Sequence, residues 1–234
     1  MTKLASEIEL YETKNHIIVG SKNNQHFYSL LAMNLNKKDI DIISKIKYKV
    51  IIALIELGIE KYNNENINKT QNIVMGFLAN ENLSENKELI AYLIAHDIIG
   101  YGPLSIILED SKNIEEILIN SPVSEIMVFH QKYGYCKTNL RFNSEREFRF
   151  VINKLLESLD RELNSDFPII DANVFNEARL HAQLKPYATN GAIAVIRLNQ
   201  NKIFNIRKLI QTNTTNIDII AYLWLAIEAN LNII

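Results

Sequence analysis

The sequence predicts an α+β protein in which a helical bundle over residues 1–99 precedes an α/β domain over residues 100–200. In the first part, apolar residues recur at three- and four-residue steps, which is the period of an amphipathic helix. In the second part, short β-rich runs flank one helical run, as expected of an antiparallel sheet with a packed helix. Residues 201–234 are predicted to form a connector and one further helix.

The composition is that of a globular protein with a sizeable core. Of the 234 residues, 47% are hydrophobic and 22% are charged, and the formal net charge is −2. The chain has no excess of basic residues of the kind that nucleic-acid-binding proteins carry, so no nucleic-acid partner is expected. The single cysteine, Cys136, excludes an internal disulfide and multi-cysteine metal sites.

A cytoplasmic protein is expected from the absence of targeting and spanning segments. Glu7 and Glu9 lie where a signal peptide would have its apolar core. The longest apolar run, residues 50–55, is far shorter than the roughly 20 residues that cross a bilayer.

Helices are predicted over residues 38–62, 71–80 and 86–99, with an Asn-rich break at 63–68. Residues 17–20 are compatible with a strand and a turn. The expected role of the amphipathic helices is to bury one face each.

Gly100 to Pro103 interrupts the helical pattern, and Pro103 suits the first turn of a short helix over 103–109. Three β-rich runs with tight connections then favour an antiparallel meander, and three more come after a helix. In order, the runs cover residues 114–120, 125–130, 135–142, 167–175, 178–184 and 192–198.

The helix between the two groups of strands is predicted to start with a capping box formed by Ser144 and Glu147. A second capping box is predicted at Thr215 to Asp218, before a helix that reaches Asn230. The first helix is expected to pack on the sheet through its apolar face, which comprises Phe148, Val151, Ile152, Leu155, Leu156 and Leu159.

Short motifs follow one another in a characteristic order from Ile94 to the C-terminus. They are Tyr101-Gly102-Pro103-Leu104, Asp110, Ile114-Glu115-Glu116-Ile117, Val128 with Gly134, Thr138 to Phe142, Pro168 to Ala172, Ile196-Arg197 and Ala221 to Glu228. Taken together they resemble the type II/type IV secretion ATPases, which power pilus, archaellum and secretion machines. The last motif is similar to the archaeal branch of that superfamily.

The resemblance implies a PAS-like α/β domain that closes over ATP held by a RecA-like motor domain. It implies ATP and Mg²⁺ as ligands of the full-length protein, a homohexamer, and a membrane platform protein as partner at the inner face of the membrane. The sequence contains no G-x-x-x-x-G-K-[ST] phosphate loop. In the family this loop would follow residue 234, so the 234-residue chain is expected to hold no cofactor and to be inactive alone.

Arginines are the candidate site residues, because a guanidinium presents a planar fork of donors to phosphate oxygens. The resemblance implies that Arg179 and Arg197 contact nucleotide phosphates, and Arg141 and Arg207 are weaker candidates. The family's Asp-Gly-x-Arg reads Asn176-Glu177-Ala178-Arg179 here, so the arginine is kept without the glycine.

No catalytic residue and no metal ligand set are expected within the chain. The histidines are scattered, and His96 and His181 are interpreted as structural groups; Asp171 is interpreted as a hydrogen-bond partner in its strand. A stand-alone PAS-like binding or scaffold module without a nucleotide role is the alternative function. A phosphate loop encoded after residue 234 would distinguish the ATPase from this module.

Overall fold

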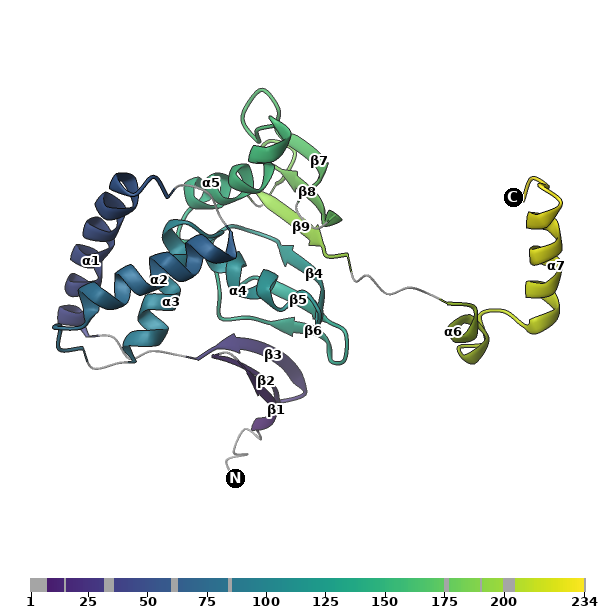
Figure 1. Ribbon diagram of the computed structural model, residues 1–234, viewed down its shortest axis with the longest axis horizontal. Coiled ribbons are helices and arrows are strands. Elements are labelled where there is room, and N and C mark those ends of the chain that lie inside the picture. Colours follow the sequence, from purple (N-terminus) through teal and green to yellow (C-terminus); the bar gives the residue numbers. More distant parts are fainter. Residues whose placement is uncertain are drawn as a thin grey trace. The chain divides into compact units, whose positions relative to one another are not determined.

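The computed structural model describes residues 8–14, 16–31, 36–59, 63–83, 86–174, 177–189, 191–199 and 205–233. The chain divides into two compact units, residues 1–199 and residues 200–234. The described part of the first unit contains a nine-stranded sheet and the helices α1 to α5, so the protein is a mixed α/β chain (Figure 1).

The sheet has the strand order β1-β2-β3-β6-β5-β4-β9-β8-β7. All neighbouring strands are antiparallel except β3 and β6, which are parallel. The strands are β1 (Ile8–Lys14), β2 (Ile17–Lys22), β3 (Gln25–Leu30), β4 (Ile114–Ile119), β5 (Met127–His130), β6 (Gly134–Lys137), β7 (Ile169–Asn173), β8 (Arg179–Gln183) and β9 (Ile193–Arg197).

Strands β1 to β3 differ from the helical region expected over residues 1–99. They form a meander in which Asn23 and Asn24, with φ values of 52° and 61°, join β2 to β3. Two successive residues with positive φ are typical of the type I′ turn, which matches the twist of a hairpin, and Asn tolerates this conformation. The turn therefore explains why this stretch is a hairpin and not a helix.

The meander joins the rest of the sheet through one ladder pair, through side-chain hydrogen bonds and through core side chains such as Tyr28. The parallel pairing of β3 with β6 consists of one register pair, Phe27 with Lys137. Beyond it, the Asn139 side chain replaces a strand: its Nδ2 donates to the Leu30 carbonyl at 2.8 Å, and its Oδ1 accepts from the Leu30 amide at 2.9 Å. A side-chain amide thus supplies both hydrogen bonds that a backbone peptide would make.

The helices of the first unit begin at asparagine or serine caps, except α4, which has Pro103 as its first residue. Asn63 accepts from the Asn66 amide at 2.7 Å, so the Asn-rich segment, which was predicted to separate two helices, itself forms the start of α2. The helices are α1 (Lys37–Glu56), α2 (Asn64–Leu78), α3 (Lys87–Ile98), α4 (Pro103–Glu109) and α5 (Glu145–Leu156), which a short 3₁₀ turn (Glu157–Leu159) follows.

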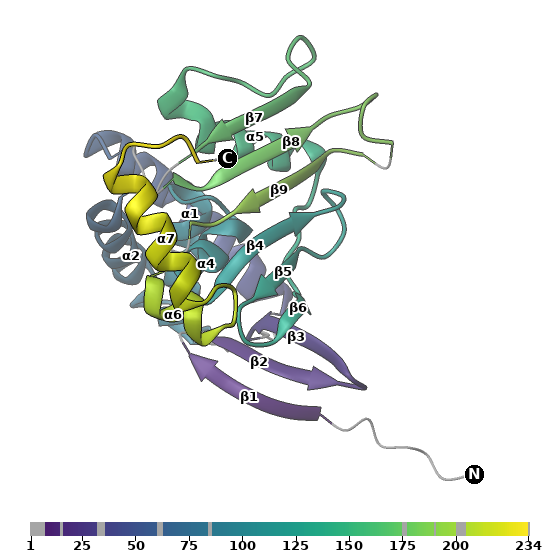
Figure 2. The ribbon, with the colours of Figure 1, turned by 90° about the vertical axis from the view of Figure 1, so that its right-hand side faces the viewer.

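One face of the sheet forms the main core with α4 and α5 (Figures 1 and 2). On α5, Val151 and Leu155 are buried as predicted, whereas Leu159 is 38% exposed, because the helix ends at Leu156 and the 3₁₀ turn changes the side-chain direction. The capping box is only half formed, because Ser144 accepts from the Glu147 amide but the Glu147 carboxylate bonds to Asn143. Helices α1 to α3 build a second cluster of buried side chains.

A lysine connects the two groups of helices. Lys154 Nζ, on α5, donates to the carbonyl of Ile99 at 2.7 Å and to that of Gly100 at 2.9 Å, directly after α3. These carbonyls have no partner inside the helix, and a cation at a helix C-terminus is favourable. Burial lowers the pKa of Lys154.

The second unit consists of α6 (Ile206–Gln211) and α7 (Ile217–Glu228). Asn216, and not Thr215, caps α7, because its side chain accepts from the Ile219 amide at 2.9 Å. Among the described residues of α7 only Ala226 is buried, although the helix is strongly apolar. No single described helix is long and apolar enough to cross a bilayer; α3 and α4, bent by 105°, satisfy length and composition only as a pair.

Candidate functional site

The candidate site lies on the sheet face opposite α4 and α5, at one end of β8 and β9. Arg179 is the first residue of β8 and Arg197 the last of β9, and the antiparallel register makes them direct Cα partners. Side chains alternate along a strand. Since Leu180 and Ile196 are buried in the core, the two arginines are on the exposed face.

The two arginines belong to a row of cross-strand partners on four strands, which we call the arginine row. Arg179 is paired with Asn173 on β7, and Arg197 with Glu116 on β4. Within the described residues no carboxylate lies within 4.0 Å of the Arg197 guanidinium. The row therefore contains two adjacent cations, of which only Arg179 has an ion-pair partner in this part of the chain.

That partner is Asp171 on β7, which is also shared with a histidine. Asp171 Oδ1 lies 3.6 Å from Arg179 Nη2, and Asp171 Oδ2 lies 3.0 Å from His181 Nδ1. The Gln183 side-chain amide is 2.7 Å from His181 Nε2. The hydrogen bond from His181 is the main reason why the pKa of Asp171 is lowered, and Arg179 adds to it.

A third arginine lies next to this network. Arg161 Nη1 donates to the backbone carbonyl of Asp171 at 2.6 Å, at the free edge of β7. Sequence reasoning missed Arg161 because it comes from the irregular segment after α5, and only the tertiary fold brings it to β7. The alternation of residues 179–183 did indicate that Arg179, His181 and Gln183 share one face, as the structure confirms.

Before β8 the backbone takes a conformation that favours glycine. Glu177 has a φ of 58°, which is left-handed and costs a residue with a side chain about 1 kcal/mol. The Glu177 carboxylate accepts from Asn199 Nδ2 at 2.8 Å, just after β9. This contact fastens the two strand ends that carry Arg179 and Arg197.

The two weaker candidates lie elsewhere. β6 ends at Lys137, so Arg141 is not at a strand end; it lines a hollow of about 300 Å³ together with residues of α1 and α3, on the helical side of the sheet. Arg207 is exposed on α6, in the second unit. The structure therefore groups Arg179 with Arg197 and does not place Arg141 in that group.

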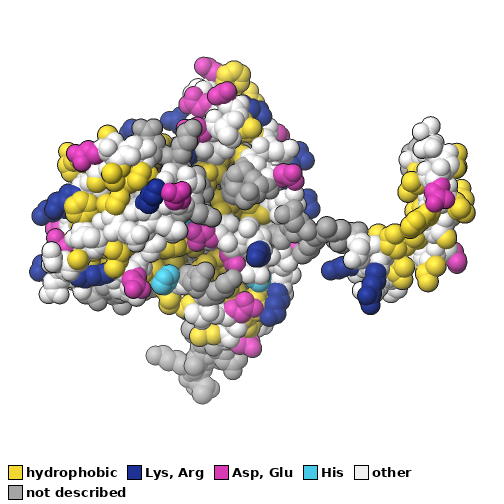
Figure 3. Space-filling model, in the orientation of Figure 1, with side chains coloured by type: hydrophobic (Ala, Val, Ile, Leu, Met, Phe, Trp, Pro, Cys, Tyr) yellow, Lys and Arg dark blue, Asp and Glu magenta, His cyan; other side chains and the backbone are white. Residues whose placement is uncertain are grey.

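The space-filling view shows basic and acidic side chains interspersed, without an extended basic patch on the face displayed (Figure 3). The described residues contain no group of three or more side chains able to hold a metal ion. Burial raises the pKa of the Cys136 thiol to about 11, so it stays protonated and unreactive. These observations leave the arginine row as the candidate site.

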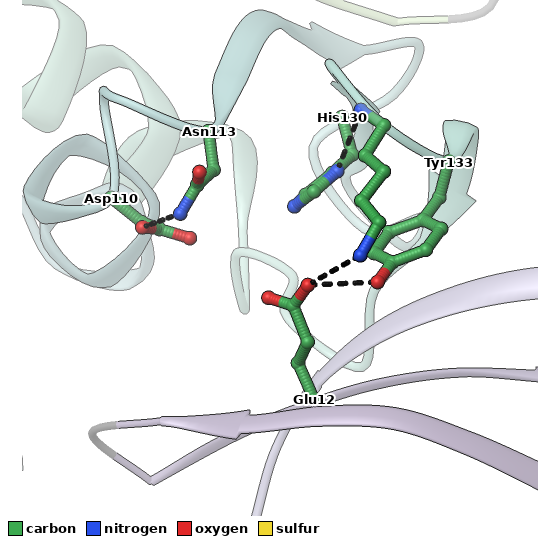
Figure 4. A network of polar contacts seen from close by, with 6 residues as sticks. Glu12, Asp110, Asn113, His130 and Tyr133 are labelled. Atoms are coloured by element: carbon green, nitrogen blue, oxygen red, sulfur yellow. Dashed lines mark hydrogen bonds and ion pairs between the residues drawn. The ribbon is translucent and has the colours of Figure 1, made fainter.

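A second polar network has a structural explanation (Figure 4). The Glu12 carboxylate accepts from Lys132 Nζ at 3.2 Å and from the Tyr133 hydroxyl at 2.8 Å, which fastens β1 to the β5–β6 turn. His130 Nδ1 accepts from the Lys132 amide, and Asp110 accepts from Asn113. The hollow beside Glu12, Asp110 and His130 measures only about 50 Å³, room for a few waters.

Comparison with known proteins gives relatives without a stated function. No family model matches the chain. Uncharacterized protein MJ1288 of Methanocaldococcus jannaschii is 28% identical over 189 residues, which are 76% of this chain and 73% of that relative. Uncharacterized protein MJ0781 of the same archaeon is 24% identical over 227 residues, 94% of this chain but only 30% of the relative.

Uncharacterized protein MJ0900, also of that archaeon, is 27% identical over 153 residues, 64% of this chain and 27% of the relative. The chain thus spans less than a third of the length of two of these relatives. Among solved structures, the VirB11 ATPase from the Brucella suis type IV secretion system, in complex with sulphate, has a TM-score of 0.39 and 15% identity, over 55% of this chain and 40% of that one. This similarity to a secretion ATPase is weak, and it decides neither fold family nor function.

Proposed function

We propose that this chain is the N-terminal regulatory and assembly region of a hexameric ATPase that powers protein secretion or the assembly of a type IV pilus or archaellum. Its α/β part would be the PAS-like domain of such a protein, and α6 and α7 would lead into a RecA-like motor domain. The observation that carries the proposal is the pairing of Arg179 with Arg197 on the exposed sheet face.

This pairing has a physical signature of an anion site. Like charges directly opposite each other on neighbouring strands are destabilising, so such a pair is expected where a ligand compensates it. Within the described residues the compensation is incomplete, because Asp171 contacts Arg179 but not Arg197, and Glu116, the Cα partner of Arg197, makes no ion pair with it. A phosphate group, which accepts hydrogen bonds from two guanidinium forks, would complete it.

The proposed mechanism divides the work between two parts of the protein. The motor domain would bind ATP and Mg²⁺, and this chain would close over the nucleotide so that Arg197 and Arg179 reach its phosphates. Positioned cations stabilise the charge that spreads over the transferred phosphoryl group. A membrane platform protein would receive the resulting motion at the cytoplasmic face of the membrane.

A stand-alone PAS-like binding or scaffold module is the second candidate function. The relative MJ1288 favours it, because 73% of that protein matches this chain, which leaves little more than a quarter for any other domain. In such a module the arginine row would bind an anionic partner without hydrolysis.

ATP turnover of the protein from its complete gene tests the proposal. Arg197→Ala should lower turnover by about 10²-fold, the usual effect of removing a donor to transition-state charge. Arg149→Ala is the matched control, because Arg149 is an exposed arginine on α5, away from the row. Turnover that is the same in both variants would contradict the nucleotide role, and a protein without ATP turnover would support the stand-alone module.

A further inference from the structure

We propose that Asp171 is an internal counter-ion that occupies Arg179 until a phosphate group replaces it, and that His181 holds Asp171 during this exchange. The inference rests on the proposed function, and it specifies how Asp171 prevents ligands of low charge from binding at the two arginines. Asp171 is in this view a positioning residue, because it acts on the anion only through Arg179.

The Asp171 carboxylate contacts His181 more closely than it contacts Arg179. Its Oδ2 is within hydrogen-bond distance of His181 Nδ1, at 3.0 Å, whereas its Oδ1 is 3.6 Å from Arg179 Nη2. A good charge-assisted hydrogen bond is about 2.7–2.9 Å long. The contact with Arg179 is therefore the weaker of the two and the one that is given up first.

Exposure makes this exchange easy. The side chains of Arg179 and Asp171 are 71% and 53% exposed, and such surface ion pairs contribute little because water and salt screen them. Arg179 can therefore turn from Asp171 toward an anion without uncovering a buried charge. The Arg161 guanidinium holds the Asp171 backbone at 2.6 Å, so β7 stays in place while the side chain changes its partner.

The register explains why the anion competes with Asp171. Asp171 and His181 are direct Cα partners, and they form the row next to the one that holds Arg179 and Arg197. An anion that contacts both arginines lies beside the Asp171 carboxylate. Repulsion between these two negative charges opposes the binding of the anion. Only a ligand with more than one negative charge, such as the end of a polyphosphate, gains enough from the two arginines to displace the carboxylate.

The tautomer of His181 determines how it holds Asp171. The Gln183 amide nitrogen donates to His181 Nε2, so neutral His181 carries its proton on Nδ1 and donates it to Asp171. The charged groups that face this pair are Arg179 on β8, Arg197 on β9, Glu116 on β4 and Arg161 beyond β7.

Titration of the 234-residue chain with tripolyphosphate at pH 8 tests the inference. Asp171→Asn keeps an acceptor for His181 but removes the competing charge, so it should bind about two- to fivefold more tightly than the wild type. Arg197→Ala should bind about tenfold more weakly, because it removes a charged donor that makes no ion pair with the described residues. Arg149→Ala, on α5, should bind like the wild type.

These variants test separately whether the two arginines bind an anion and whether Asp171 competes with that anion for Arg179. If Arg197→Ala loses affinity while Asp171→Asn binds no better than the wild type, Asp171 supports Arg179 instead of competing for it, and the inference is wrong although the anion site stands. If Arg197→Ala binds like the wild type, the anion site itself fails. Undetectable binding of tripolyphosphate to Asp171→Asn also contradicts the inference.

Sulfate binding at pH 8 gives a readout of the role of His181 that a merely structural role would not change. His181→Ala removes the group that holds Asp171 Oδ2, so Asp171 is left to Arg179 and sulfate should bind more weakly than to the wild type. The double variant His181→Ala/Asp171→Asn should bind sulfate as tightly as Asp171→Asn alone, because the competing carboxylate is absent from both. Equal affinity of His181→Ala and the wild type would overturn the role given to His181.

Discussion

Arg179 and Arg197 are cross-strand partners on the sheet face that none of the described helices of the first unit covers. Two cations in this arrangement repel each other, and within the described residues only Arg179 has a carboxylate oxygen within 4.0 Å, since Glu116, the Cα partner of Arg197, makes no ion pair with it. Their side chains contribute nothing to the core, which Leu180 and Ile196 fill from the other face. Substitution of either arginine should therefore separate function from folding.

The first prediction is that Arg197→Ala changes stability little. Its melting temperature should stay within about 2 °C of the wild type, because exposed substitutions rarely change the free energy of unfolding by more than ~0.5 kcal/mol. In the full-length protein, the turnover of the Arg179→Ala/Arg197→Ala double variant should fall by less than the product of the two single effects, since both arginines serve one phosphate. Unfolding of the single variant, or effects that multiply fully, would contradict this.

The second prediction is that the 234-residue chain alone does not hydrolyse ATP. Positioning by a phosphate loop supplies much of phosphoryl-transfer catalysis, and the sequence contains no such loop. Phosphate release should equal that of buffer. Release above buffer that a substitution in this chain abolishes would contradict the prediction.

The third prediction concerns the helix on the sheet. Leu155 is 3% exposed on α5, so Leu155→Ala should lower the free energy of unfolding by about 2–5 kcal/mol, as for other buried leucines. Leu159→Ala is the matched control and should cost less than about 1 kcal/mol, because Leu159 is 38% exposed. Denaturant unfolding measures both, and equal losses would mean that the described packing is incorrect.

The fourth prediction concerns Asn139, which joins the meander to the sheet. Asn139→Ala removes both hydrogen bonds to Leu30 and should cost about 1–3 kcal/mol. Amide hydrogen exchange in β1 to β3 should become faster, while exchange in β4 and β9 stays unchanged. Asn139→Asp keeps only the acceptor, so its loss of stability should lie between zero and that of Asn139→Ala. Uniform acceleration of exchange across the sheet would contradict a local role of Asn139 at the meander.

The fifth prediction is a pH effect from His130, which is 3% exposed beside the small polar hollow. Burial is the main reason why the pKa of His130 is lowered. Below about pH 6.5 the unfolded chain binds a proton that folded His130 does not, so stability is complete above that pH and is lost as the pH falls through the folded pKa. His130→Gln should flatten the stability profile between about pH 7 and pH 5, and an unchanged slope would assign the effect to other histidines.

Local signals in the sequence were sufficient for the order and type of the elements after Gly100, although β6 ends at Lys137 and not at residue 142. The helix 103–109 has the predicted bounds, because Gly102 and Pro103 determine its start. The meander could not be read in the same way, since its apolar alternation is weak and its signal, the Asn23-Asn24 turn, is easily taken for composition bias. Its parallel attachment to β6 joins residues that are far apart in the chain, which no local pattern specifies.

The candidate site was predictable in part for the same reason. Alternation placed Arg179, His181 and Gln183 on one face, and the resemblance pointed to Arg179 and Arg197. That Asp171 contacts both Arg179 and His181 depends on the β7–β8 register, which follows from the packing of the core and not from residues 167–184 alone. The position of Arg161 beside Asp171 depends on the path of the chain after α5.

The two hydrogen bonds from Lys154 have a mechanical consequence. They fasten the exit of α3 to the last turn of α5, which itself packs on the sheet. A force applied to α1–α3 by a partner would reach the sheet as a rigid displacement, because any slip between α3 and α5 breaks two charge-assisted hydrogen bonds at once. Helices α1–α3 and the sheet that carries the arginines are therefore expected to move together, because Lys154 connects them.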